Sequence, residues 1–341
     1  RLRGGMSSAP SASEIACDAR WLVQALDPAT RIARLIEMSP EAYRAASFLD
    51  DRMLQGPVNA HGMPFDEVAA AMPGEARSDA RWIFHIGHVG STLVARLLGE
   101  LDEVLAIREP RILRDVAGLA GVQRGAIVPA IQRLLSRTFG PNEIALVKAT
   151  SFVSEIAAEL VPPGERALFL TADPRRYIAT ILAGENNLKE LHAWAGDRAR
   201  RMTGRVHGLS GGSPAQLAAA AWACEMTALE AAAEAMTDRH LMWANFDRLL
   251  DDMEAGLGEI AKFFGFKASA EQLQAIVSGP LLARYSKALE YDYSPSLRTQ
   301  LIDQEFSLHG GEIDDALAML ERSAQESPLL ARALKRSPAR S

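Results

Sequence analysis

Short apolar runs alternate with amphipathic or polar stretches through the middle of the chain. Four of these runs, at residues 82–86, 144–147, 167–170 and 241–246, have the length of buried strands, and each is followed by a helical or polar segment. Such alternation is typical of a parallel sheet that is covered by helices on both faces. We therefore expect an α/β protein with a three-layer fold around a mainly parallel sheet.

The chain on either side of this core has a different pattern. Apolar residues such as Ile32, Leu35 and Ile36 fall at helical spacing within residues 19–54, and Ser39-Pro40 resembles a helix N-cap followed by proline. Residues 55–74 contain three prolines and three glycines, which is typical of a loop, and they place a boundary near residue 78. The predicted regions are a helical N-terminal region at 6–78, an α/β core at 79–270 and a helical C-terminal region at 271–341.

Composition limits the class of protein. With 341 residues, 48% hydrophobic and 23% charged, the chain can bury a large core, which excludes disordered, collagen-like and disulfide-scaffold proteins. Lysine and arginine number 37 against 43 acidic residues, so the net charge of −6 gives no overall electrostatic reason to expect nucleic acid as a partner. Residues 1–5 read Arg-Leu-Arg-Gly-Gly before the first methionine, like the end of ubiquitin, and we expect them to be a tag remnant.

Several features predict a cytoplasmic protein. The alanine-rich run at residues 216–236 contains three glutamates, so we expect a packed helix rather than a membrane span. Residues 7–14 are small and polar, unlike a signal peptide. Cys17 and Cys224 are too few and too far apart for a zinc site or a disulfide framework, and we expect both to be reduced, buried thiols.

The most informative segment is the strand, glycine turn and amphipathic helix at residues 82–98. Unpaired backbone amides and the positive end of a helix converge at such a turn, and glycine lets an oxyanion approach the backbone. Ser91 and Thr92 would add hydroxyl donors. Ser91 follows Gly90 directly, so the lysine of a Walker A motif is missing, which disfavours an ordinary P-loop NTPase. The alternative is a tight strand-to-helix turn that holds no ligand.

This segment resembles a known family. His88-Val-Gly-Ser-Thr-Leu is similar to the 5'-phosphosulfate loop of sulfotransferases that use 3'-phosphoadenylyl sulfate (PAPS), whose usual form is Lys/Arg-Ser-Gly-Thr-Thr-Trp/Leu. The segment that begins at Trp243, with the Phe-Phe-Gly ending at Gly265, resembles the late strand and helix of the same family. The resemblance implies a P-loop-like fold that binds PAPS, without a metal ion, through Gly87, His88, Val89, Gly90, Ser91 and Thr92.

The resemblance also implies catalytic residues. Glu109 lies 19 residues after Gly90, where tyrosylprotein-type and several bacterial sulfotransferases place a catalytic glutamate, and Lys148 matches a lysine that reaches the transferring sulfuryl group. Glu109 would take the proton of the acceptor hydroxyl, while Lys148 and His88 would neutralise the bridging oxygen. Two alternatives assign no catalytic role: Glu109 could pair with Arg108 or Arg111 at a helix start, and Lys148 could be an exposed strand-end lysine.

The part that would bind the 3'-phosphate of the donor departs from the family pattern. The family has an arginine eight residues before a serine, and here Ala172 stands eight residues before Thr180. Thr180 can replace the serine, and Arg175 or Arg176 could supply the missing cation; alternatively, the donor lacks a 3'-phosphate. Ser286 and Lys287 lie where the family often has a late loop that closes over the nucleotide.

Acceptor binding is less well defined by the sequence. Residues 184–212 are polar and locally basic, and they could form either a solvated helix face and loop or a lid that binds the acceptor. The helical additions could line the acceptor pocket or form a homodimer contact. The pocket itself should lie at the carboxyl ends of the parallel strands.

Taken together, these features predict transfer of a sulfuryl group from PAPS to a hydroxyl of a small molecule or glycan. Two other functions stay open at this point. One is a Mg²⁺-dependent P-loop phosphotransferase in which Asp173 holds the ion. The other is a non-catalytic nucleotide-binding protein that kept the fold.

Overall fold

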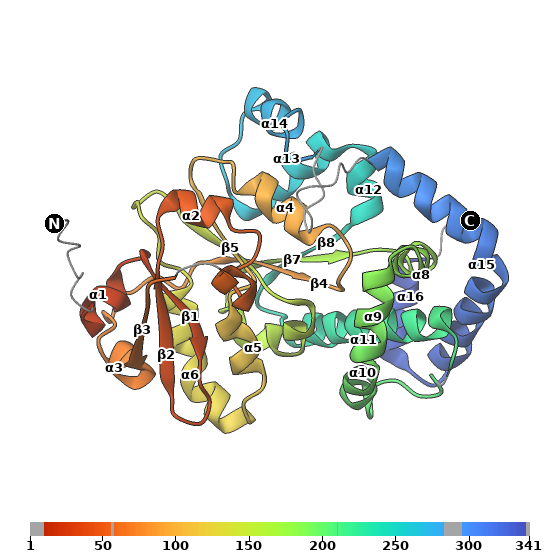
Figure 1. Ribbon diagram of the computed structural model, residues 1–341, viewed down its shortest axis with the longest axis horizontal. Coiled ribbons are helices and arrows are strands. Elements are labelled where there is room, and N and C mark those ends of the chain that lie inside the picture. The colour runs from red at the N-terminus through yellow and green to blue at the C-terminus, as the bar shows by residue number, and fades with distance from the viewer. Residues whose placement is uncertain (1–9, 56–57, 210, 283–294, 339–341) are drawn as a thin grey trace.

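A parallel five-stranded sheet forms the centre of the computed structural model, which describes residues 10–55, 58–209, 211–282 and 295–338 (Figure 1). The strand order is β5-β6-β4-β7-β8. The strands are β4 (Arg81–His85), β5 (Val104–Arg108), β6 (Ile144–Lys148), β7 (Arg166–Thr171) and β8 (His240–Asn245). The four strands predicted from apolar runs are confirmed, and β5 is a fifth strand that was not predicted.

The connections around β4 define where a ligand can bind. In the order of the sheet, β5 and β6 lie to one side of β4, and β7 and β8 lie to the other. The chain runs from β4 to β5 and β6, and then passes β4 to reach β7. Open α/β sheets bind ligands outside the carboxyl ends of the strands at such a switch point. The loop at residues 86–90 leaves β4 at this position.

Helices cover both faces of the sheet, which confirms the predicted three-layer α/β architecture. In Figure 1, α4 (Ser91–Leu98) and α13 (Met253–Phe264) lie on one face, and α11 (Pro214–Ala235) lies on the other. The remaining core helices are α5 (Arg111–Ala117), α6 (Gly121–Leu134), η2 (Ser151–Ile156), α7 (Ala157–Leu160), α8 (Pro174–Leu182), α9 (Glu185–Ala193), α10 (Ala195–Met202) and α12 (Phe246–Asp251). The C-terminal helices are α14 (Ala270–Val277), α15 (Pro295–Ala324) and α16 (Pro328–Arg336).

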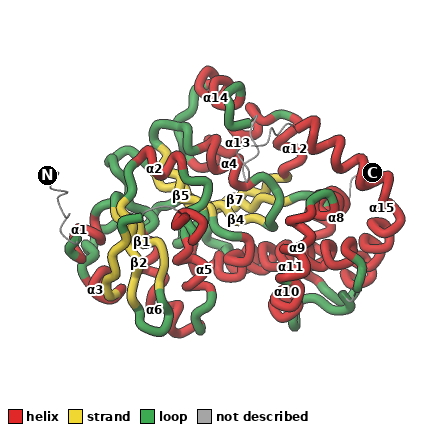
Figure 2. The backbone as a smooth tube through the Cα atoms, viewed as in Figure 1, coloured by secondary structure: helices red, strands yellow, loops and turns green. Residues whose placement is uncertain are grey.

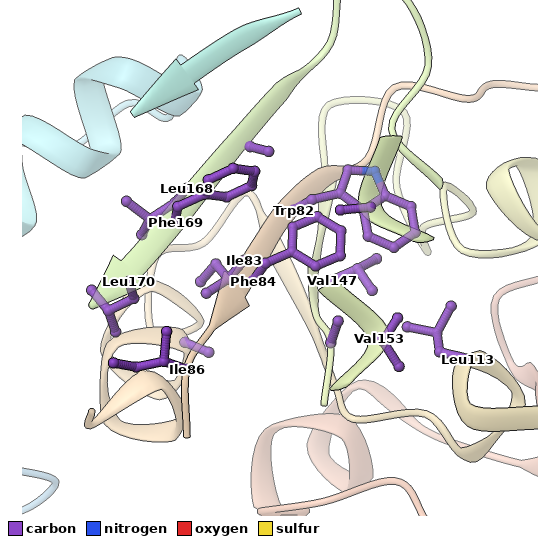
Figure 3. Packing of buried hydrophobic residues seen from close by; sticks show 14 of the residues in the cluster. Trp82, Ile83, Phe84, Ile86, Leu113, Val147, Val153, Leu168, Phe169 and Leu170 are labelled. Atoms are coloured by element: carbon purple, nitrogen blue, oxygen red, sulfur yellow. The ribbon is translucent and has the colours of Figure 1, made fainter. Parts of the chain in front are cut away.

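Aromatic side chains cross the sheet in register and form part of its core (Figure 3). Phe84 pairs with Phe169 on β7, which pairs with Trp243 on β8, and the ring centroids of these two pairs are 5.9 and 4.9 Å apart. Trp82 stacks on Phe84 from the same strand. Trp82, Phe84 and Phe169 are fully buried, because helices cover both faces of the sheet.

The predicted helix over residues 19–54 is wrong in its first half. Residues Trp21–Leu26 form β1 and Ile32–Glu37 form β2, an antiparallel pair that β3 (Ala60–Pro64) extends to three strands (Figure 2). On β2, burial alternates from exposed Ile32 to buried Leu35, as in a strand, and Ile36 breaks the alternation because it is also buried. β1 is buried at every position, including Gln24, so its sequence lacks the alternation of apolar and polar residues that marks a half-buried strand.

Other N-terminal predictions are mixed. The N-cap at Ser39 is confirmed, since its side chain accepts a hydrogen bond from the amide of Ala42 and α2 (Pro40–Ala45) follows. The predicted loop at residues 55–74 contains β3 and α3 (Phe65–Ala70), while α1 (Ala12–Cys17) and η1 (Asp51–Gln55) complete the region. Cys17 is exposed, contrary to expectation, and Cys224 is buried.

The alanine-rich helix α11 is packed inside the protein, as predicted. Its buried Glu225 and Glu230 form ion pairs with Arg201 and Arg336. Within the described residues, no helix combines the length and apolar character that a membrane span requires.

Candidate functional site

The loop after β4 has the backbone geometry of an anion site. Gly87, His88 and Gly90 have φ angles of 82°, 52° and 62°, and Gly90 is the N-cap of α4, where no side chain caps the first turn. A Cβ atom at Gly90 would lie 2.0 Å from the ring of Phe246, so only glycine fits there. The first-turn amides of α4 therefore lack side-chain acceptors, which is the arrangement that binds anionic oxygens at a helix start.

Glu109 and Lys148 meet beside this loop. Arg108 and Lys148 are paired residues of β5 and β6, so Glu109 directly follows the strand and its amide donates to the carbonyl of Lys148 at 2.7 Å. The Nζ of Lys148 donates to Oε1 of Glu109 and, at 3.2 Å, to the hydroxyl of Thr92. Glu109 is 7% exposed and Lys148 is 1% exposed, so this is a buried ion pair in contact with the first turn of α4.

Both alternatives considered for these residues are excluded by the contacts. Arg108 donates to the backbone carbonyls of Tyr43 and Ala46, and Arg111 pairs with Asp115 and Asp51, so neither arginine partners Glu109. Lys148 is not an exposed lysine. The φ angle of Glu109 is 51°, a strained value of the kind that occurs at functional sites.

Two arginines from outside the sheet complete the surroundings of Glu109. Arg52 lies 2.9 Å from Oε2 and Arg114 lies 3.6 Å from the same oxygen, and buried Asp50 pairs with both arginines. Burial alone would raise the pKa of Glu109, but the charges of Lys148, His85 and Arg52, together with the hydrogen bond from Lys148, outweigh it and lower the pKa to about 2. The carboxylate is therefore ionised throughout the physiological pH range.

A cavity of about 310 Å³ joins these groups. Its wall contains all six residues from Gly87 to Thr92 together with Glu109 and Lys148, so the structure brings these sequence-predicted site residues together. The basic segment at residues 184–212 lines the other side through Glu190, Trp194, Asp197, Arg198 and Arg201. Much of that segment forms the helices α9 and α10. One part of it lines the cavity, and other side chains are exposed to solvent, such as that of Arg200 with 79% exposure.

His85, at the end of β4, and His88, in the glycine loop, have different surroundings. His85 accepts from the amide of Gly87 through Nδ1 at 3.0 Å, and its Nε2 contacts the carbonyl of Ala149 at 2.9 Å, so backbone groups hold the ring. The Nε2 of His88 lies 3.7 Å from Glu190 of α9, and its side chain is 8% exposed. The side chain of His88 thus extends from the glycine loop to α9 and forms part of the cavity wall.

The residues predicted to bind a 3'-phosphate lie on α8, and only some of them are grouped. Arg175 points to α15, where it pairs with Asp314 at 2.6 Å and lies over the ring of Phe306. Arg176 lies 3.0 Å from buried Asp247 of α12. Thr180, one turn later on α8, donates its hydroxyl hydrogen bond to the carbonyl of Arg176. Ser286 and Lys287 lie outside the described residues.

Arg298 joins this group and was not found from the sequence. From α15 it donates to Asp247 and, at 3.3 Å, to the hydroxyl of Thr180. Its guanidinium lies 5.5 Å from the ring centre of Phe246, the side chain that abuts Gly90. We call Arg176, Arg298 and Thr180 the α8 cluster. The ring of Phe246 lies between Arg298 of this cluster and Gly90 of the glycine loop. Arg298 is 118 residues from Thr180 in sequence, so no local pattern could reveal it.

A magnesium site at Asp173 finds no support in the geometry. Asp173 is 1% exposed, and its side chain caps α8 by accepting from the amide of Arg176 at 2.9 Å. It does not line the cavity. Among the described residues, there is no cluster of three or more histidine, cysteine, aspartate or glutamate side chains suited to hold a metal ion.

Comparisons with known proteins give matches among solved structures alone. The sequence matches no protein-family model and no curated protein. The sulfotransferase domain of the curacin biosynthetic pathway is 14% identical, with a TM-score of 0.41 over 66% of this chain and 89% of that domain. A mouse sulfotransferase complexed with PAP is 11% identical, with a TM-score of 0.41 over 77% and 90% of the two chains. The sulfotransferase domain of the Synechococcus olefin synthase is 14% identical, with a TM-score of 0.37 over 66% and 93%.

Proposed function

We propose that this protein is a sulfotransferase that moves a sulfuryl group from PAPS to a hydroxyl group of a small molecule or glycan. The observation that carries the proposal is the buried Glu109–Lys148 ion pair, which touches the first turn of α4 beside an uncapped glycine loop. Such a site combines an anion cradle, a cation and a carboxylate within one cavity. Sulfuryl transfer requires these three parts, in the same way as phosphoryl transfer.

The loop would hold the phosphosulfate end of PAPS. The donor supplies an activated sulfuryl group: the acceptor oxygen bonds to sulfur, and the sulfur–oxygen bond to the phosphate breaks with its electron pair going to the phosphate. Amides of the loop and the hydroxyls of Ser91 and Thr92 can donate hydrogen bonds to anionic oxygens there. His88 and Lys148 border the same space and can neutralise charge on the leaving phosphate.

Lys148 has a further role in setting the basicity of Glu109. A carboxylate with a pKa of about 2 is a weak base, because a general base works best when its pKa is near the operating pH. Lys148 lies between Glu109 and Thr92 of the loop, so an anion bound at the loop competes with Glu109 for the ammonium group. Loss of that partner raises the pKa of Glu109, which then accepts the proton of the acceptor hydroxyl.

The α8 cluster would bind the 3'-phosphate of the donor. At the position where the family has an arginine, this chain has Ala172, which carries no charge. Arg298 together with Arg176 supplies positive charge beside the hydroxyl of Thr180. Asp247 holds both arginines, and its Oδ2 is buried without a hydrogen-bond partner among the described residues. The cluster therefore contains two guanidinium groups that are already oriented by one carboxylate.

The direct test is calorimetric titration with PAP (3'-phosphoadenosine 5'-phosphate) in the presence of EDTA. We expect micromolar binding of PAP without metal and no comparable binding of ATP with Mg²⁺. Sulfuryl transfer from PAPS to a panel of hydroxyl compounds is then expected without added divalent ions. Binding of ATP with Mg²⁺ alone would favour the phosphotransferase, and binding of PAP without any transfer would favour the non-catalytic nucleotide-binding protein.

Arg298→Met should weaken PAP binding about 10- to 100-fold, the effect of losing one charge-assisted contact of roughly 1.5–3 kcal/mol. Adenosine 5'-phosphosulfate lacks the 3'-phosphate, so its affinity should stay the same. Arg175→Met is the matched control, because Arg175 pairs with Asp314 on α15 and is not in contact with Thr180. Equal weakening of both nucleotides would show that Arg298 acts on the fold and not on the 3'-phosphate.

A further inference from the structure

Among the described residues, most of the charged side chains that line the cavity pair with one another, and Arg198 does not. Glu109 pairs with Lys148, and Glu190 lies 3.7 Å from His88. Glu225 pairs with Arg201 at 2.8 Å, and Asp197 pairs with Arg200 at 2.9 Å. Arg198 lines the same cavity and forms no ion pair with any residue in the described part of the chain.

The hydrogen bonds of Arg198 are equally incomplete. Its Nη1 donates to the carbonyl of Leu191 at 3.3 Å, and its buried Nε has no hydrogen-bond partner among the described residues. Buried polar groups in native proteins nearly always have partners, and a guanidinium presents five N–H donors in a planar fork. A charged group that is left unsatisfied at a cavity wall is a reason to expect an anionic ligand there.

Arg198 is held by a rigid support. The next turn of α10 carries Arg201, which pairs bidentately with Glu225 of α11 at 2.8 and 2.9 Å and also reaches Glu155 of η2 at 3.0 Å. Arg205 pairs with the same Glu155 at 2.7 and 2.8 Å. Helix α10 is thereby tied to the core beside the cavity, so Arg198 is presented in a fixed position rather than on a loose lid.

An aromatic surface lies next to the guanidinium. The amide of Arg198 donates to the carbonyl of Trp194 at 3.0 Å, so the two side chains are one helical turn apart on the same face. Trp194 is 50% exposed although it lines the cavity, and Phe48 and Phe152 are also part of the cavity wall. An exposed indole beside an uncompensated guanidinium suits a molecule that has both an apolar ring and a negative charge.

We propose that the acceptor is a hydroxylated carboxylic acid with an aromatic or other apolar body. Its carboxylate binds Arg198, its apolar body lies against Trp194, and its hydroxyl is directed to Glu109. Arginine suits this role because its fork matches the two oxygens of a carboxylate. The inference rests on the proposed function, and it narrows the acceptor to an acid.

The experiment compares two ligands of similar shape: 4-hydroxyphenylacetate, which has a carboxylate, and 4-ethylphenol, which is neutral. Binding of each is measured by calorimetry to the protein with and without saturating PAP. We expect the acid to bind at least 10-fold more tightly than the neutral phenol. Arg198→Met should abolish this difference, leaving the affinities for 4-ethylphenol and PAP unchanged. Arg200→Met, on the exposed face of the same helix, should keep the difference and so serves as the matched control.

Three results would overturn the inference. The first is an acid that binds no more tightly than the neutral phenol, including the case in which neither ligand binds. The second is a preference for the acid that survives in Arg198→Met. The third is a loss of PAP affinity in that variant, which would place Arg198 in the donor site. Failure of the proposed function has a different signature, namely a protein that binds the acid through Arg198 but does not bind PAP.

Discussion

Glu109→Gln is expected to lower kcat for sulfuryl transfer by about 10²- to 10⁴-fold, the usual contribution of a positioned general base. The amide has nearly the same shape as the carboxylate but cannot accept the hydroxyl proton. Glu109 borders the glycine loop without being part of it, so the affinity for PAP should change by less than the loss in kcat. Steady-state kinetics and calorimetric titration with PAP measure the two effects separately.

The substitution also disturbs the fold, so a structural control is needed. It leaves Lys148 buried beside a neutral amide, and breaking a buried ion pair in this way costs about 3–5 kcal/mol. In Glu109→Gln/Lys148→Met no unpaired charge remains, and much of that stability should return without activity. A Glu109→Gln protein that transfers sulfuryl groups at the wild-type rate would contradict the assignment of Glu109 as the base.

The pH dependence of the unfolding free energy tests whether Glu109 is ionised and paired in the folded protein. The pKa of Glu109 is about 2 in the folded protein, below the ordinary value of 4.5. Its carboxylate therefore contributes stability above about pH 4.5, and that contribution is lost as the pH falls through the folded-state pKa. The difference in unfolding free energy between wild type and Glu109→Gln should accordingly shrink between about pH 5 and pH 2.

Gly90→Ala is expected to lower the free energy of unfolding by about 2–5 kcal/mol and to abolish PAP binding. The left-handed φ of 62° costs an alanine about 1–2 kcal/mol, and the Cβ would lie 2.0 Å from the ring of Phe246. Forcing an extra methyl group into packed surroundings adds about 1–3 kcal/mol. Movement of Phe246 to relieve this clash would also move the loop and the guanidinium of Arg298 that lies over the ring. Chemical denaturation and PAP titration measure the two effects.

Gly164→Ala is the matched control for the backbone cost. Its φ is 80°, and no atom lies within 4 Å of the position that a Cβ would occupy, so this variant should lose about 1–2 kcal/mol and keep its PAP affinity. In Gly90→Ala/Phe246→Ala the clash is absent, so the two substitutions should be less destabilising together than the sum of their separate effects. Additive effects would show that contact with Phe246 does not restrict the loop.

The sequence predicted those elements of the fold that a short stretch of consecutive residues specifies, and it failed where an element depends on pairing with a distant segment. Four core strands could be predicted because they are apolar runs followed by helical or polar segments. The strand β5, which Glu109 directly follows, was not predicted. The first two strands of the N-terminal sheet were predicted as helix, since β1 is buried on both faces and β2 has apolar residues at spacings that fit either structure. The third, β3, was predicted as loop. The secondary structure of these residues depends on their pairing with another strand and not on the spacing of apolar residues alone.

The candidate site shows the same division. The glycine loop is a contiguous motif, and Glu109 and Lys148 stand at recognisable distances from it, so the sequence was sufficient to select them. The partners that define their chemistry come from elsewhere: Arg52 precedes the core, and Arg298 follows it on α15. Arg198 belonged to a basic segment that the sequence left open as solvated surface or acceptor contact.

Sequence by itself determined the alternating strands and helices and the glycine turn between β4 and α4, because each of these depends on neighbouring residues. Tertiary structure alone decided that Lys148 and Glu109 are buried together, that Arg298 contacts Thr180, and that Arg198 lines the cavity with no carboxylate partner among the described residues. The physical reason is that charge pairing and burial depend on distances in space between segments far apart in the chain, which no local pattern encodes.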